Sequence, residues 1–113
     1  MAAVYVSNLV VNTGTTFTQT FSLENSDSSS ALNLSGYTVS AQMRKHPGSS
    51  SYTPFSASVL NPSGGTIRVG LGTTTTATLK PGRYVYDVLI SDNTGVITRV
   101  VEGSVLVREG VTR

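Results

Sequence analysis

Residues 79–88 read Leu-Lys-Pro-Gly-Arg-Tyr-Val-Tyr-Asp-Val, and this stretch is the most informative part of the chain for its fold. A Pro-Gly turn leads into a strand in which every second residue is apolar or aromatic. A tyrosine at the start of such a strand can donate a hydrogen bond back to the loop before it, an arrangement called a tyrosine corner. We therefore predict that Tyr84 makes this bond and that Tyr86 takes the next inward position.

A period of two runs through the rest of the chain and outweighs any helical period. Alternating segments begin near residues 17, 37 and 67, and turn signals at residues 12–14, 61–65 and 92–95 separate them. Together they predict an all-β chain: one domain over residues 1–113, folded as an antiparallel immunoglobulin-like β-sandwich of about seven strands. The predicted inward set is Phe17, Phe21, Leu23, Val39, Met43, Ile67, Val69, Leu79, Tyr84, Tyr86 and Val88. Gln19 is the one polar member of the Phe17–Leu23 apolar row.

Several segments depart from simple alternation. The threonine run before Leu79 predicts a short turn that crosses from one sheet to the other, with Ala77 and Leu79 pointing inward. Gly103 predicts a bulge or bend in the last strand. The small polar segments 25–30 and 46–51 are expected to be the least ordered internal loops, because they bury little apolar area to offset ordering entropy.

Composition narrows the class of function. The net charge is +2 and only 12% of residues are charged, which is too little for binding nucleic acid by phosphate neutralisation. The chain has no Cys, so disulfides are impossible and a structural zinc site is not expected. The start, Met1-Ala2-Ala3-Val4, lacks the basic and apolar regions of a signal peptide, and no stretch approaches the roughly 20 apolar residues of a membrane helix. Synthesis in the cytoplasm is expected, with no membrane partner.

We find no pattern that predicts catalysis, and we expect no catalytic, cofactor-binding or metal-binding residues and no cofactor. The single histidine, His46, lies in a predicted loop and is interpreted as solvated. Asp27 with Glu24, or Asp92 with Asn93, could hold calcium loosely, but neither pair has the ligand count of a dedicated site.

Two side-chain groups have more than one interpretation. Asp87 is expected to pair with Arg99 across the hairpin turn at residues 92–95; the alternative is an ion pair at an interface. Tyr52 is expected to cap the core, the alternative being an exposed ring that stacks on a sugar.

A family resemblance carries the interpretation further. It rests on Asn33-Leu34-Ser35-Gly36-Tyr37-Thr38-Val39, on Gly65-Thr66-Ile67-Arg68-Val69, on residues 79–88 and on residues 95–105. With these segments the chain resembles the small Ig-like structural proteins of tailed bacteriophage virions, and is similar to the N-terminal domain of upper baseplate proteins of phages of lactic-acid bacteria. The resemblance implies a non-enzymatic structural or assembly subunit of the tail, baseplate, neck or head decoration. It also implies a virion location, with other virion proteins and further copies of the chain as partners.

Two hypotheses remain open at this stage. In the family the domain is followed by a longer fibre-like region, and the end at Arg113 favours an assembly subunit over a receptor-binding one. The alternative is a carbohydrate- or receptor-binding Ig-like module at a virion or cell surface, which the tyrosines and the Ser/Thr surface favour. For assembly, we expect the opening run (residues 4–11) or the closing run (residues 96–107) to pair with a strand of another subunit. The alternative is that these two runs pair with each other or within their own sheets.

Overall fold

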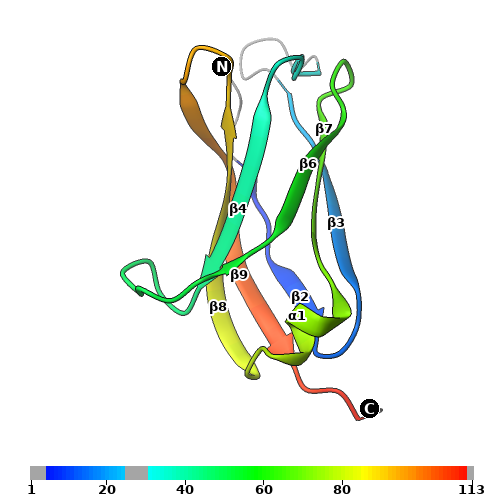
Figure 1. The fold of residues 1–113 in the computed structure, drawn as a ribbon, viewed down its shortest axis with the longest axis vertical. Coiled ribbons are helices and arrows are strands. Elements are labelled where there is room, and N and C mark those ends of the chain that lie inside the picture. Colours follow the sequence, from blue (N-terminus) through cyan, green and yellow to red (C-terminus); the bar gives the residue numbers. More distant parts are fainter. Residues whose placement is uncertain (1–4, 25–30, 112–113) are drawn as a thin grey trace.

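Two β-sheets stacked face to face make up the molecule (Figure 1). The computed structural model describes residues 5–24 and 31–111. In chain order the elements are β1 (Tyr5–Val6), β2 (Leu9–Asn12), β3 (Phe17–Ser22), β4 (Thr38–Arg44), β5 (Thr53–Pro54), β6 (Ser56–Asn61), β7 (Thr66–Leu71), α1 (Thr73–Ala77), β8 (Gly82–Ser91) and β9 (Ile97–Arg108). No helix among these described residues is long and apolar enough to span a membrane.

The larger sheet has the order β1-β9-β8-β4-β5, and β2 also pairs with β9, so that it contains six strands. The smaller sheet has the order β3-β7-β6. All neighbouring strands are antiparallel except β1 and β2, which run parallel to β9. The predicted all-β, two-sheet architecture is confirmed. The strand count exceeds about seven because the opening run splits into β1 and β2 and because the short β5 precedes β6.

The core lies between the two sheets. Seven of the predicted inward residues are buried there: Phe21, Leu23, Met43, Ile67, Val69, Tyr86 and Val88. The other four are partly buried and pack against this core: Phe17, Val39, Leu79 and Tyr84. Three aromatic rings connect the sheets, because Phe55 lies 6.2 Å from Phe17 of β3 and 6.0 Å from Tyr86 of β8 between ring centroids. Aromatic pairs at such separations are favourable beyond the area they bury.

The predicted tyrosine corner is present. The Tyr84 hydroxyl donates to the Lys80 carbonyl at 2.8 Å, four residues back along the chain. The Lys45 ammonium lies 5.0 Å from the centroid of the Tyr84 ring. The corner therefore fixes the turn by which the chain enters β8.

The crossing between β7 and β8 is the short helix α1, as the sequence predicted, but its inward residue is different. Ala77 is exposed, so the prediction that it points inward is wrong. Thr76 is fully buried instead. Its hydroxyl donates to the carbonyl of Thr15 at 2.8 Å, which satisfies the polar group and ties α1 to the loop before β3.

The opening run breaks at Ser7 and Asn8, where it is held tightly against β8 and β9. The Ser7 amide donates to the Glu102 carbonyl at 2.9 Å, and the Ser7 carbonyl accepts the Tyr86 hydroxyl at 2.6 Å. The Asn8 side-chain oxygen accepts the amide and the hydroxyl of Ser104, both at 3.1 Å. Burial raises the pKa of the Tyr86 phenol above its ordinary value, so this hydroxyl keeps the proton that it donates.

Gly103 permits this close approach and does not form a bulge. A Cβ atom at Gly103 would clash with the Ser7 carbonyl oxygen, so any side chain would displace the opening run. The irregularity predicted at Gly103 lies instead at Val100, since Val88 pairs with Val101 and Leu89 pairs with Arg99. The extra residue turns two consecutive valines inward, and both are fully buried.

Because β1 and β2 both pair with β9, the closing run lies inside the larger sheet. The alternative, that the two runs pair with each other, is therefore correct for residues 101–102 and 105–108, which are not free for another subunit on that side. Pairing of the outer side of the opening run with another subunit stays a prediction. Of the two loops expected to be poorly ordered, residues 25–30 lie outside the described residues. Residues 46–51 form a loop in which the Ser49 amide donates to the His46 carbonyl at 3.0 Å; its mobility stays a prediction.

We expect Tyr86→Ala to lower the free energy of unfolding by roughly 3–5 kcal/mol, because it empties a buried aromatic site. Tyr86→Phe keeps the ring and removes only the bond to Ser7, so its cost should be about 1 kcal/mol. Urea unfolding monitored by circular dichroism measures both variants. Equal stability of the Ala variant and the wild type would contradict the position of Tyr86 in the core.

Candidate functional site

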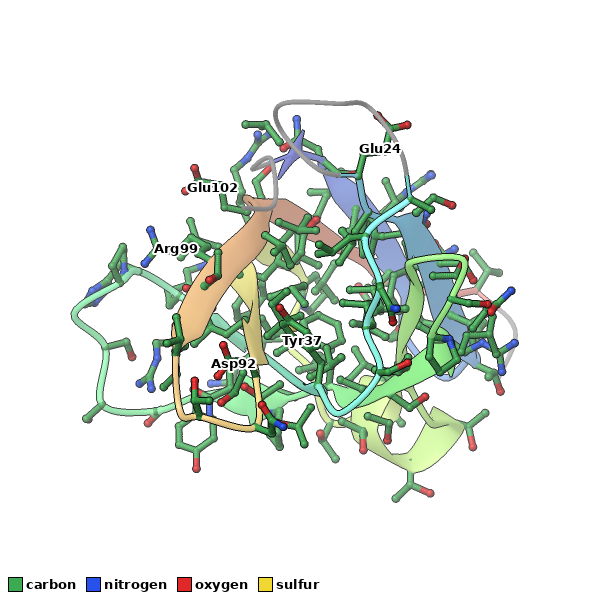
Figure 2. All side chains as sticks on the ribbon, turned by 90° about the horizontal axis from the view of Figure 1, so that it is seen from above. Glu24, Tyr37, Asp92, Arg99 and Glu102 are labelled. Atoms are coloured by element: carbon green, nitrogen blue, oxygen red, sulfur yellow. The ribbon has the colours of Figure 1, made fainter. Side chains whose placement is uncertain are left out.

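The outer face of the larger sheet carries a groove of about 670 Å³. Its floor is β8, its two sides come from β4 with the following loop and from β9, and one end is bounded by β1. The side chains that shape it are Val6, Gln42, Arg44, Pro47, Val85, Asp87, Leu89, Arg99 and Glu102. Figure 2 shows Arg99 and Glu102 on the outer side of the sheet, turned away from the space between the two sheets.

Strand register places one row of side chains straight across this groove. Gln42 of β4 is opposite Asp87 of β8, Asp87 is opposite Glu102 of β9, and Glu102 is opposite Val6 of β1. Two carboxylates therefore face each other on neighbouring strands, a pairing that is unfavourable by itself.

Arg99 offsets this repulsion. Its Nε lies 3.3 Å from an Asp87 carboxylate oxygen and its Nη1 lies 3.9 Å from a Glu102 carboxylate oxygen. The predicted Asp87–Arg99 pair is thereby confirmed. The Arg99 side chain is 55% exposed, so water screens the pair and its contribution to stability is small. The cluster is a charged surface feature and not a structural requirement of the fold.

Arg44 on the opposite side of the groove is held in place by three groups. It donates to the Ser49 carbonyl at 2.6 Å and to the Gln42 side-chain oxygen at 3.1 Å. Its guanidinium carbon lies 4.8 Å from the centroid of the Tyr52 ring. Tyr52 is 52% exposed, so the prediction that it caps the core is wrong. The loop at residues 46–51 carries Tyr52 out over the sheet, where stacking on Arg44 replaces core contact.

The charges within the groove balance, because two guanidinium groups and two carboxylates line it together with the apolar side chains of Val85 and Leu89. Val6 is 76% exposed and adds apolar surface at one end. Apolar side chains with balanced charges among them occur at protein–protein interfaces, and the balance does not favour a purely anionic or cationic ligand. The groove is therefore suited to a protein surface.

No metal-binding cluster of three or more His, Asp or Glu side chains occurs within residues 5–24 and 31–111. His46 is an exposed loop residue, as predicted. Of the two calcium hypotheses, the one with Asp27 lies outside the described residues. In the other, one oxygen of Asp92 already accepts the Thr94 amide at 2.9 Å, the Thr94 hydroxyl at 2.7 Å and the Val96 amide at 3.0 Å. Asp92 therefore serves the hairpin turn between β8 and β9.

Sequence reasoning identified the charged members of the groove but not the groove itself. Alternation marks Gln42, Arg44 and Asp87 as outward residues of their strands. Nothing local fixes which residue of β4 lies opposite which residue of β8, nor that the opening run places Val6 beside Glu102. Those neighbours depend on register between strands far apart in the sequence.

Comparison with known proteins gives a likeness in fold. No protein-family model matches the chain, and no curated protein matches its sequence. Among solved structures, a mutant of the SrpA adhesin from Streptococcus sanguinis is similar to 96% of this chain, with 14% identity and a TM-score of 0.52. An internalin-like protein of Listeria monocytogenes is similar to 95% of it, with 12% identity and a TM-score of 0.43. The chain spans 57% of the adhesin structure and 28% of the internalin-like structure. At such identity the adhesin likeness shows the fold alone.

The bonds that Asp92 accepts from Thr94 and Val96 lower the pKa of its carboxyl group below the ordinary value. The turn should therefore be intact above about pH 4, the unfolded pKa, and loosen only as the pH falls through the lowered folded pKa. NMR titration of the Asp92 carboxyl carbon and the Thr94 amide measures both events. Asp92→Asn is the matched control, because it keeps an oxygen acceptor and removes the titration. A carboxyl midpoint at or above the ordinary value would contradict this account of the turn.

Proposed function

We propose that the chain is a non-enzymatic assembly subunit of a tailed-phage particle, built as an immunoglobulin-like sandwich, which docks on a neighbouring virion protein through the groove of the larger sheet. The observation that carries the docking proposal is the row Gln42, Asp87, Glu102 and Val6 with Arg99 across it. Facing carboxylates held by one exposed arginine contribute little to the monomer. A partner that excludes water from them would strengthen their interactions.

The immunoglobulin-like part of the proposal is supported by two features. The sheet order, with a first strand that runs parallel to the last one, agrees with a two-sheet sandwich of this type. The Tyr84–Lys80 bond supplies the tyrosine corner. The virion part is supported by the resemblance of residues 33–39, 65–69, 79–88 and 95–105 to small phage structural proteins.

A second candidate is a carbohydrate- or receptor-binding module. Exposed Tyr52, beside Arg44 at one side of the groove, favours it, because an accessible aromatic ring suits sugar stacking. One solved structure similar in fold is an adhesin, and a surface-binding role for this chain would agree with that name. Binding through Tyr52 would need no partner in a particle.

Incorporation into purified particles tests the first candidate. Particles of the phage or prophage that encodes the chain, purified on a density gradient, should contain it when analysed by mass spectrometry. Complementation with Arg99→Glu, which places three carboxylates together, should lower its incorporation at least tenfold, a loss of about 1.4 kcal/mol in docking. Lys80→Glu makes the same charge change away from the groove and should incorporate normally.

Two outcomes would contradict this proposal: absence of the chain from the particles, or equal incorporation of the Arg99 and Lys80 variants. A glycan array probed with the purified chain separates the second candidate. Binding that Tyr52→Ala abolishes, together with absence from particles, would establish the carbohydrate-binding role instead.

A further inference from the structure

Strand β3 forms an open edge of the smaller sheet. Within the described part of the chain it pairs with β7 on one side and with no strand on the other. The Leu23 amide donates to the Gly65 carbonyl at 2.7 Å, in the same register as the β3–β7 ladder. Backbone N–H and C=O groups alternate in direction along a strand, so those of Phe17, Gln19 and Phe21 point toward β7. Thr18, Thr20 and Ser22 therefore direct their N–H and C=O groups away from the sheet.

The outer edges of β5, of β1 with β2 and of β6 are blunted by features that discourage strand addition. β5 has two residues and one of them is Pro54. β1 and β2 have two and four residues, and the Ser7–Asn8 break separates them. β6 shows a register shift between Val59 and Asn61. In contrast, β3 keeps six residues in unbroken register and contains no charge and no proline.

Gln19 covers part of this edge. It is the polar residue in the otherwise apolar row of β3, and its side-chain amide donates to the Thr20 carbonyl at 3.2 Å. That carbonyl points outward, to the position where the N–H of an added strand would donate. The bond is exposed to water, so a backbone N–H can replace it at small cost.

We propose that β3 pairs antiparallel with β3 of a second copy about a two-fold axis at Thr20, which joins two three-stranded sheets into one six-stranded sheet. Thr20 then lies opposite its own copy, and Thr18 lies opposite Ser22 of that copy. Such an interface is self-complementary, as two-fold symmetry requires. Opposed Thr and Ser side chains are favourable cross-strand pairs.

Charge does not oppose this pairing. β3 has no ionisable side chain, and the nearest charge on the smaller sheet is Arg68, opposite Thr20 on β7. In the dimer the two Arg68 residues would be three strand spacings apart, about 14 Å. The Debye length at physiological ionic strength is about 8 Å, so the repulsion between the two Arg68 residues is largely screened.

This self-association lies on the smaller sheet and docking through the groove lies on the larger one, so either can fail while the other holds. Sedimentation equilibrium over a wide concentration range should show reversible dimers of the wild type. Thr20→Pro removes an outward N–H, which a strand edge tolerates, and should abolish dimers while the melting temperature changes by only a few degrees. Ala57→Pro is the matched control on β6, where residue 57 also points its backbone outward, and should dimerise as the wild type does.

Two further variants keep the test decisive if Thr20→Pro unfolds. Thr20→Lys puts two like charges opposite each other at the axis and should abolish dimers. Gln19→Ala uncovers the Thr20 carbonyl and should tighten the dimer roughly two- to tenfold. A wild type that stays monomeric at every concentration would overturn the proposal. Folded Thr20 variants that dimerise normally, or loss of dimers in Ala57→Pro, would overturn it as well.

Discussion

The cluster of hydrogen bonds at Ser7 and Asn8, in which the Tyr86 hydroxyl donates to the Ser7 carbonyl where Gly103 has no side chain, is the constraint on which the arrangement of strands depends. It holds the opening run against β9, so that the run becomes an outer strand of the larger sheet and the closing run an inner one. Because the opening run pairs with β9, it does not pair with β3, and β3 has no strand on its outer side within the described residues. The sheet that gains the N-terminal segment and the sheet that exposes an edge are therefore both set by how the opening run docks on β9.

The two sheets consequently present different surfaces. The larger sheet has an outer face with balanced charges, in which Arg99 holds two opposed carboxylates and Tyr52 and Gln42 hold Arg44. The smaller sheet has an uncharged edge of alternating hydroxyl side chains. We propose the first surface for docking on a different protein and the second for pairing with a copy of the same chain. Figure 1 shows that β3 and β8 belong to different sheets, so the proposed self-pairing and the proposed docking use separate parts of the molecule.

The sequence correctly predicted the features that depend on the residues nearest to them in the chain. Alternation placed Met43, Ile67 and Val88 in the core, the Pro-Gly turn placed the Tyr84 corner, and the hairpin turn brought Asp87 near Arg99. It left open whether the opening run pairs with the closing run and did not predict that they run parallel, because that pairing joins the two ends of the chain. It misplaced Ala77 and Tyr52 for a related reason: their directions depend on how α1 and the loop at residues 46–51 meet the sheets.

The most direct test is amide hydrogen exchange, followed by NMR at a concentration where the protein is monomeric. It measures whether the opening run pairs with β9 and whether the outer edge of β3 is unpaired. The account predicts slow exchange at Ser7 and Thr13, whose amides donate to Glu102 and Arg108 of β9. It predicts fast exchange at Thr18, Thr20 and Ser22, with protection of Gln19 and Phe21 between them. Slow exchange at Thr18, Thr20 and Ser22 in the monomer, or fast exchange at Ser7 and Thr13, would contradict it.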